Sequence, residues 1–261
     1  MPAPASLRAR ILAREPLLGT FLNMGSAVAA DLYGEAGLDF AVVDMEHGAT
    51  TEATLLPMLH ALGGTACAPV VRVEEGTRLR IGRALDFGAR ALMVPRVDSL
   101  DHAREIVRFV RYPPSGARGI ALPTRFARYG RLGHADVATA HEDVALFIQV
   151  ESELALDAVE QVAALDGVDV LFVGPTDLSH ALGVPGDIKS AEYRRAVERV
   201  GRAAADRGKA AGVLLWTIDD LPPYRDAGYT VLAVGSDGSA IAAAARRAFA
   251  DFRQAYGQGL A

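Results

Sequence analysis

The sequence predicts an α/β fold, and within that class a (β/α)8 (TIM) barrel made by a single domain over residues 1–261. Three observations support this prediction: short apolar segments alternate with longer amphipathic ones, there are eight apolar segments, and their spacing is even. A doubly wound open sheet would use the same alternation, but no Gly-x-Gly-x-x-Gly motif follows the first apolar segment. The barrel is therefore the favoured architecture.

The predicted strands are runs of Val, Ile, Leu, Phe and Ala without the in-and-out alternation of a half-exposed sheet. Such runs are typical of strands that are buried on both faces. The strands are expected at residues 18–22, 40–43, 70–73, 91–94, 145–150, 170–173, 212–216 and 231–234.

The segments between these strands are predicted to be helices. Residues 101–110 place their apolar side chains on one stripe, and residues 190–208 begin with Ser190, a good N-cap, and end at Gly208, a typical helix stop. Further N-caps are expected at Thr50, Ser99, Asp219 and Ser236.

One stretch, residues 111–143, breaks this rhythm because it is long, punctuated by Gly and Pro, and rich in arginine. Long irregular segments in compact domains are usually lids or binding loops. A lid or binding loop is therefore expected here.

The composition excludes several classes of protein. The 27 basic and 32 acidic residues give a net charge of −5 without a long run of either sign, which argues against nucleic acid or an anionic membrane as a partner. The single cysteine, Cys67, excludes an intrachain disulfide and is predicted to be a buried thiol. Residues 1–8 lack an apolar signal core and no apolar run has membrane-spanning length, so a cytoplasmic location is expected.

Catalytic groups of such barrels lie where strands end and the following loops begin. The second predicted strand runs into a cluster of three titratable residues, Asp44, Glu46 and His47. An Asp three positions before a His can orient the imidazole and raise its basicity. The alternative is a helix-capping Asp beside an exposed His, and the position at a strand end favours the catalytic interpretation.

The third predicted strand carries Arg72 inside an apolar run. A buried guanidinium needs an anionic partner. It could form an internal ion pair with Asp44 or Asp86, or it could clamp a carboxylate or enolate oxygen of a substrate, and both could hold at once. Arg96, after the fourth strand, is a weaker candidate for the same clamp.

The fifth and sixth strands end in acidic residues on neighbouring positions of the predicted barrel. Gln149 and Glu151 are two residues apart and so share a face, and Gly174 leads into Thr176 and Asp177. Two carboxylates without a nearby His or Cys suit a hard, oxygen-preferring cation, and the backbone N–H groups at residues 176–177 could bind a carboxylate. The alternatives are a loop salt bridge for the glutamate and a helix N-terminal acid for the aspartate.

Two further features leave alternatives open. Trp216 at the end of the seventh strand either lines the pocket or packs, and residues 235–238 (Gly-Ser-Asp-Gly) form either a phosphate site or a capped turn.

Seven short motifs occur in one order along the chain: Asp44-x-Glu46-His47, Val70-Val71-Arg72, Leu85-Asp86-x-Gly88, Met93-Val94-Pro95, Arg118-Gly119, Gln149-Val150-Glu151 and Gly174-Pro175-x-Asp177-Leu178-Ser179. Together they resemble the HpcH/HpaI aldolase (citrate lyase-like) family, in particular its 4-hydroxy-2-oxo-acid and 2-keto-3-deoxy-sugar-acid branch. The resemblance runs from Gly19 to Gly235.

The resemblance implies a (β/α)8 barrel, a class II pyruvate aldolase dependent on Mg2+, Mn2+ or Co2+, and a homohexamer with a helix exchanged between subunits. Such an enzyme cleaves a 4-hydroxy-2-oxo acid into pyruvate and an aldehyde. A lyase for CoA esters or citrate, an oxaloacetate decarboxylase or tautomerase, and a catalytically silent metabolite-binding barrel are the alternatives. A Schiff base is not expected, because the only lysines, Lys189 and Lys209, do not lie at predicted strand ends.

The resemblance also implies roles for individual residues. Glu151 and Asp177 would ligate the metal, while Gln149, Gly174 and the backbone at Thr176 would contact the 2-oxo acid. Arg72 would stabilise the enolate and bind substrate, and Asp177 would contact the substrate as well. His47 would be the acid/base residue, oriented by Asp44 and by Asp86 of its own or a neighbouring subunit. Two departures, Phe21 where relatives often have Trp and Arg96 where some have an uncharged residue, leave the aldehyde undefined.

Overall fold

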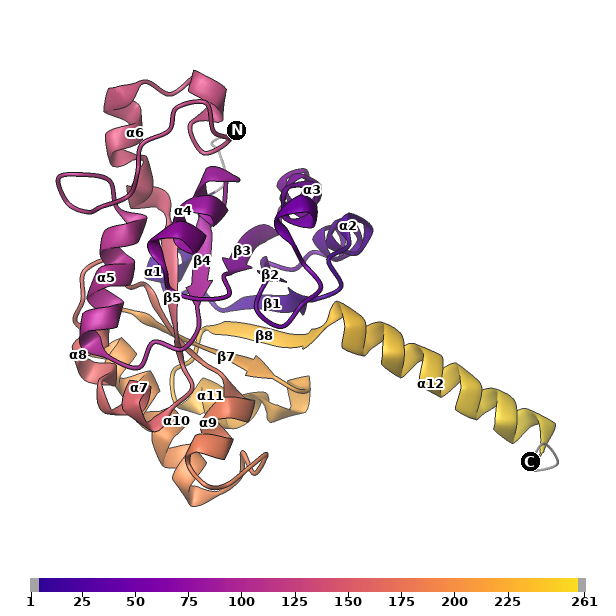
Figure 1. The fold of residues 1–261 in the computed structure, drawn as a ribbon. Helices are drawn as coiled ribbons and strands as arrows, with labels where there is room; N and C mark the ends of the chain where they lie inside the picture. Colours follow the sequence, from indigo (N-terminus) through magenta and orange to yellow (C-terminus); the bar gives the residue numbers. More distant parts are fainter. Residues whose placement is uncertain (1–4, 258–261) are drawn as a thin grey trace.

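Eight parallel strands pair in chain order, and β8 pairs with β1, so that the sheet closes into a barrel (Figure 1). The computed structural model describes residues 5–257, and the first four residues of the N-terminal segment lie outside this part. The predicted fold class is confirmed. The strands are β1 (Leu17–Leu22), β2 (Phe40–Asp44), β3 (Ala68–Arg72), β4 (Ala91–Val94), β5 (Ala145–Val150), β6 (Val170–Val173), β7 (Ala210–Leu215) and β8 (Val231–Ser236).

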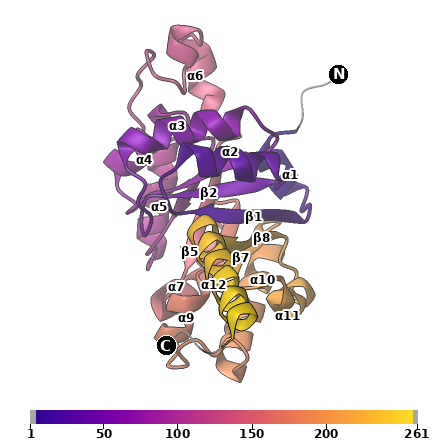
Figure 2. The same cartoon turned by 90° about the vertical axis from the view of Figure 1, so that its right-hand side faces the viewer.

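Helices surround most of this barrel (Figures 1 and 2). They are α1 (Leu7–Leu12), α2 (Ala27–Glu35), α3 (Glu52–Gly63), α4 (Arg78–Asp86), α5 (Leu100–Val110), α6 (His134–Ala140), α7 (Glu153–Asp157), α8 (Val159–Ala163), α9 (Pro175–Ala181), α10 (Ala191–Ala205), α11 (Leu221–Asp226) and α12 (Asp237–Tyr256). Short 3-10 turns are η1 (Arg128–Gly130), η2 (His141–Asp143) and η3 (Ile218–Asp220).

Some element ends differ from the sequence prediction. β7 begins two residues earlier than expected because Ala210 and Ala211 pair with β6, and alanine is a weak strand signal. The N-caps Ser99, Ser190 and Ser236 are confirmed, since each side chain accepts a hydrogen bond from a backbone N–H three residues later. The expected caps at residues 50 and 219 are wrong; α3 begins after Thr51 and η3 after Thr217.

Alternate residues along each strand belong to two separate cores. In β2, Phe40 and Val42 pack inside the barrel, whereas Ala41 and Val43 pack outside against the helices. The inner core is closed at the N-terminal ends of the strands by Ile11 of α1, which packs with Leu17 of β1. The opposite, C-terminal ends of the strands form the mouth of the barrel.

Of the two expectations for residues 111–143, a lid or a binding loop, the lid is wrong within this chain, because the segment lies away from the mouth. Arg90, just before β4, donates hydrogen bonds to the backbone oxygens of Phe126 and Ala140, and Arg8 donates one to the backbone oxygen of Glu142. The physical reason is topological, because this segment connects the end of α5 to the start of β5. Strand starts in a parallel barrel lie at the N-terminal end.

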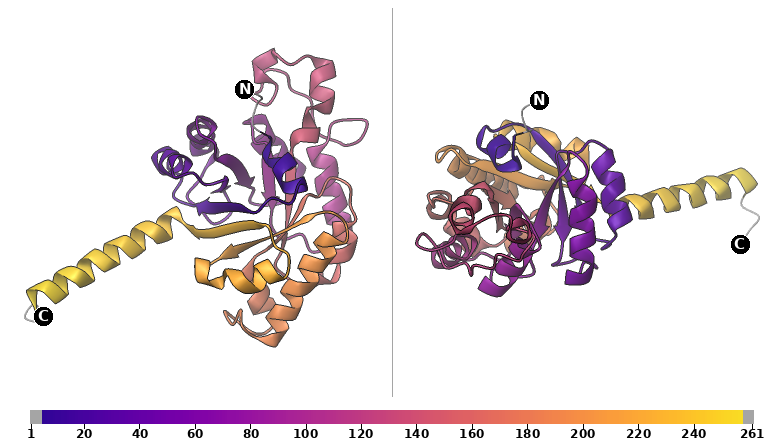
Figure 3. Two further views of the ribbon diagram at one scale, coloured as in Figure 1. Left: turned by 180° about the vertical axis from the view of Figure 1, so that it is seen from behind. Right: turned by 90° about the horizontal axis from the view of Figure 1, so that it is seen from above.

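Helix α12 projects from the barrel (Figures 1 and 3). Only Asp237, its first residue, is buried, while Ile241, Phe249, Phe252 and Tyr256 are exposed. The helix therefore presents apolar side chains that no other described element of this chain covers.

Two predictions from composition can be compared with the structure. Cys67 is buried, as expected, and burial raises the pKa of its thiol to about 12. Among the described residues, no helix is both long and apolar enough to cross a membrane.

Candidate active site

The strand alternation that fills the inner core also determines which side chains reach the mouth. Asp44 follows Val42 by two residues, Arg72 follows Val70, and Gln149 follows Phe147, and the three earlier residues all belong to the inner core. The polar residues are buried next to this core, Asp44 at 2% exposure and Gln149 also at 2%. One face of each strand therefore changes from apolar to polar as the strand ends.

Arg72 is held by two carboxylates of β2 and the loop after it. Asp44 and Arg72 are register partners on neighbouring strands. Arg72 Nε and Nη2 donate hydrogen bonds of 2.8 and 2.7 Å to the two oxygens of Asp44, and Nη1 lies 3.0 Å from Glu46 Oε2. The Arg72 guanidinium also lies over the Phe21 ring, 5.0 Å from its centroid. The internal ion pair with Asp44 that the sequence suggested is therefore confirmed.

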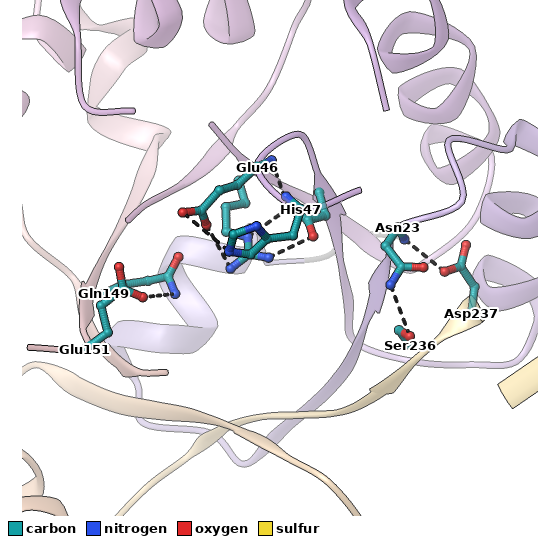
Figure 4. A network of polar contacts seen from close by, with 9 residues as sticks. Asn23, Glu46, His47, Gln149, Glu151, Ser236 and Asp237 are labelled. Carbon is teal, nitrogen blue, oxygen red and sulfur yellow. Dashed lines mark hydrogen bonds and ion pairs between the residues drawn. The ribbon is translucent and has the colours of Figure 1, made fainter. Parts of the chain in front are cut away.

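His47 lies at the edge of this cluster with its side chain 69% exposed. Asp44 does not contact its imidazole; its Oδ1 instead accepts hydrogen bonds from the backbone N–H groups of Glu46 and His47. The nearest carboxylate is Glu46, whose Oε1 is 3.7 Å from His47 Nε2 (Figure 4). Glu46, to which the sequence analysis assigned no role, thus lies between Arg72 and His47.

Glu151 accepts hydrogen bonds from Arg96, just after β4, and from Gln149. Its Oε1 accepts a 2.7 Å hydrogen bond from the backbone N–H of Arg96, and its Oε2 accepts one of 3.1 Å from Gln149 Nε2 (Figure 4). Arg96 has a left-handed φ of 54°, and its own side chain is exposed. A Cβ at Gly174 would stand 3.1 Å from Glu151 Oε2, so a larger residue there would press on this carboxylate.

The acidic side chains at the mouth influence one another. Burial is the main cause that raises the pKa of both Glu46 and Glu151, and Asp177 raises both pKa values further through its charge. Glu46, Glu151 and Asp177 thus lie within electrostatic range of one another, and Asp44 is a fourth carboxyl group beside the Arg72 guanidinium. Such an excess of negative charge fits a divalent cation.

The donor set fits a hard cation as well. Gln149 Oε1 is buried and accepts no hydrogen bond within the described structure. This oxygen, beside Glu151, can therefore bind a ligand. Within residues 5–257, no group of three or more His, Cys, Asp or Glu side chains is arranged to hold a metal. A site on Glu151 and Asp177 would therefore rely on two protein ligands, with water and substrate completing the coordination.

Thr176 and Asp177 lie in the first turn of α9, and both are exposed. Gly174, the N-cap, offers no side-chain cap, so none of its atoms competes for the first N–H groups of this helix. Their use by a substrate carboxylate stays a prediction.

Asp86 is not joined to the other predicted residues within this chain. It ends α4 and accepts a 3.2 Å hydrogen bond from Nη2 of Arg118, a buried arginine stacked on Phe126. Within residues 5–257 its hydrogen bond and ion pair are with Arg118, not with His47. A role beside His47 therefore depends on a neighbouring subunit.

The rim between β7, β8 and β1 bears on two open alternatives. Trp216 continues the inward side of β7 two residues after Leu214 and is 44% exposed, which favours the pocket-lining interpretation. Residues 235–238 form a capped turn: Asp237 is fully buried and accepts hydrogen bonds from the backbone N–H groups of Asn23, Met24 and Gly238 (Figure 4). A carboxylate at this position opposes phosphate binding.

Neither lysine lies at the C-terminal end of a strand. Lys209 immediately precedes β7, at the N-terminal end of the barrel, and Lys189 is exposed in the loop between α9 and α10. Lys209 is therefore not placed to form a Schiff base with a ligand at the mouth.

Comparison with known proteins agrees with this geometry. The chain is 38% identical over 253 residues to a hydroxypyruvate/pyruvate aldolase of Paraburkholderia phytofirmans, covering 95% of this chain and 97% of the relative. It is 35% identical to a 5-keto-4-deoxy-D-glucarate aldolase of Klebsiella pneumoniae, covering 90% and 91%. A solved HpcH/HpaI aldolase/citrate lyase family protein from Burkholderia cenocepacia superposes with a TM-score of 0.89 at 38% identity, covering 95% and 98%.

The family described as HpcH/HpaI aldolase/citrate lyase matches residues 17–244, from the first residue of β1 into α12. This range contains all the strands and every residue of the mouth discussed above. The chain belongs to the HpcH/HpaI aldolase/citrate lyase family.

Proposed function

We propose that this chain is a class II aldolase that reversibly cleaves 4-hydroxy-2-oxo acids to pyruvate and an aldehyde. The observation that carries the proposal is the arrangement at the barrel mouth: a buried arginine held by Asp44 lies within electrostatic range of Glu151, as does Asp177, and neither lysine lies at the end of a strand. The names of the similar aldolases support pyruvate or hydroxypyruvate as the carbon nucleophile.

Glu151 and Asp177 are the proposed ligands of the divalent metal that class II aldolases use, with Mg2+, Mn2+ and Co2+ as candidates. Such a cation, when bound, supplies Lewis acidity that stabilises negative charge on the substrate's oxygen atoms. Gln149, the Gly174 backbone and the Thr176 N–H would orient the 2-oxo acid beside these carboxylates. These assignments rest on the place of these residues at the strand ends and on the family to which the chain belongs.

The residues of this chain would divide the retro-aldol step between them. His47 accepts the proton of the C4 hydroxyl, directly or through a water, as the C3–C4 bond breaks. The bonding electrons move to the C2 oxygen, where Arg72 places positive charge near the developing oxyanion. Protonation at C3 then gives pyruvate, and C4 leaves as the aldehyde carbon.

A screen of 4-hydroxy-2-oxo acids with a lactate dehydrogenase-coupled readout tests the proposal. We expect pyruvate release that EDTA abolishes and that Mg2+, Mn2+ or Co2+ restores, and no borohydride trapping with pyruvate. Successful trapping would contradict the metal mechanism. CO2 release from oxaloacetate without any aldol product would indicate a decarboxylase, and cleavage of acyl-CoA substrates alone would indicate a lyase of the citrate type.

A homo-oligomer, with a hexamer as the expected size, belongs to the same proposal. The exposed apolar residues of α12 support it, as do Val28 and Leu32, which are 71% and 67% exposed on α2. In such an assembly, Asp86 would approach the His47 of a neighbouring copy. A cytoplasmic location stays a prediction.

A further inference from the structure

The carboxylate of Asp44 is fully occupied. Its Oδ1 accepts hydrogen bonds from Arg72 Nε and from two backbone N–H groups, and its Oδ2 accepts one from Arg72 Nη2. The side chain is 2% exposed, so it cannot turn toward solvent. An Asp–His pair between residues 44 and 47 would therefore require the loss of a buried bidentate ion pair, which is unfavourable.

Glu46 has the free capacity that Asp44 lacks. Its Oε2 forms an ion pair with Arg72 Nη1 at 3.0 Å but has no hydrogen bond, although it is buried. Its Oε1 faces His47 Nε2 at 3.7 Å. A buried carboxylate oxygen without a hydrogen bond is costly, so a small reorientation of this side chain is favourable.

We infer that Glu46 is the positioning carboxylate of this site: it holds the His47 imidazole through Nε2 and at the same time holds Nη1 of Arg72. The catalytic role of the pair rests on the proposed function. The pairing of Glu46 with His47 rests on the distances given above. A separation of 3.7 Å is too long for a hydrogen bond, and a small ring rotation or one water would close it. Catalytic contacts of this kind commonly tighten when substrate binds.

The pairing defines which atom of His47 does the chemistry. With Nε2 directed to Glu46, Nδ1 is the nitrogen left to take the proton of the substrate hydroxyl. Glu46 also connects the proton-transfer residue to the arginine that stabilises the oxyanion. Both groups are then oriented from one loop, residues 45–48 after β2.

A measurement independent of catalysis tests the pairing. In the full-length, Mg2+-loaded protein, deuterium exchange of histidine C2–H can be followed peptide by peptide by mass spectrometry. We expect Glu46→Gln to change the exchange rate of His47 at least twofold and to leave exposed His60 unchanged. Glu52→Gln is the matched control, because Glu52 lies on α3 and pairs with Arg83 of α4 instead. It should change the exchange rate of neither histidine.

Kinetics separate positioning from packing. Glu46→Gln keeps the volume and leaves both Asp44–Arg72 hydrogen bonds in place, so the fold should persist. We expect kcat to fall about tenfold to a hundredfold with KM within about threefold, and Glu46→Asp to recover part of kcat. A loss seen mainly in KM, or no loss, would overturn the inference.

The two proposals fail separately. If the wild type cleaves no 4-hydroxy-2-oxo acid, the proposed function fails while the exchange experiment still decides the Glu46–His47 pairing. If cleavage is normal but Glu46→Gln leaves His47 exchange unaltered, only the pairing is wrong. If the exchange rate of His47 changes in Asp86→Asn but not in Glu46→Gln, the carboxylate that positions His47 is Asp86 of a neighbouring subunit.

Discussion

At the scale of single residues, Arg72 is the group whose shape matters most. Its planar guanidinium binds both oxygens of Asp44 through two nitrogens and Glu46 through the third, a fork that the single nitrogen of an ammonium group does not reproduce. We expect Arg72→Lys to lower kcat about a hundredfold, because a lysine that stays with Asp44 no longer reaches the oxyanion. The measurement is steady-state retro-aldol kinetics together with Mn2+ titration by calorimetry.

The contrast between the two measurements is the informative part. Arg72 touches neither Glu151 nor Asp177 in the described contacts, so Mn2+ affinity should change less than about threefold. Arg104→Lys, on the exposed face of α5, is the matched control and should alter neither quantity. Near-normal turnover in Arg72→Lys would remove this residue from the oxyanion site.

The sequence predicted which residues gather at the mouth better than how they pair. Apolar runs ending in polar residues identify strand ends, so Asp44, Arg72, Gln149 and Glu151 could be predicted from position alone. The pairing depends on strand register: residues 44 and 72 are partners, which directs Asp44 to arginine rather than to His47. The Arg96 N–H on Glu151 could not be predicted, because it requires a left-handed φ in a non-glycine residue.

At the scale of elements, the end of β7 bears on the aldehyde that the sequence left undefined. Trp216 continues the inward side of this strand and is exposed at the mouth, and its ring lies near Gly186 in the loop after α9. We expect Trp216→Ala to raise KM for the aldehyde about tenfold in the aldol direction, because an apolar wall of the acceptor side is lost. KM for pyruvate should stay within about twofold.

The comparison is made by varying each substrate at a saturating level of the other. Tyr129→Ala removes another exposed aromatic side chain, at the N-terminal end of the barrel, and should leave both KM values unchanged. Equal rises in both KM values after Trp216→Ala would instead indicate a general distortion of the mouth.

The position of residues 111–143 relative to the mouth was predicted wrongly. The length and composition of this segment indicated a lid or a binding loop, which is a rule about loops in general. Its place in the chain order, between a helix and the next strand, assigns it to the N-terminal end. Topology should therefore take precedence over composition whenever the fold class is already predicted.

At the scale of the whole molecule, the eightfold alternation made the barrel predictable because each strand–helix unit repeats the same pattern of burial. The direction of the last helix was not predictable in this way. Nothing in residues 237–256 distinguishes a helix that folds back from one that projects, since Ser236 caps the start in either case. Only the contacts of α12 show that its apolar residues are uncovered in a single chain.

The uncovered residues of α12 lead to a prediction about assembly. Phe249 and Phe252 are 64% and 44% exposed on one helix, a costly arrangement for a chain that stays monomeric. We expect the full-length protein to run as an oligomer of the 27.5 kDa chain in light scattering, with six copies as the expected number. Replacing both phenylalanines with Asp should shift it to a smaller species, because two charges would be buried in the contact.

A matched control separates apolar contact from charge. Arg246→Asp with Arg247→Asp places two new carboxylates on exposed positions of the same helix, changes the net charge twice as much, and should still retain more of the oligomer than the phenylalanine variant. Circular dichroism shows whether each variant keeps its helices, since a dissociated chain must still hold a closed barrel. A wild-type protein that is monomeric at micromolar concentration would contradict the assembly. Because Asp86 is proposed to act across subunits, dissociation should also lower kcat without removing any residue of the mouth.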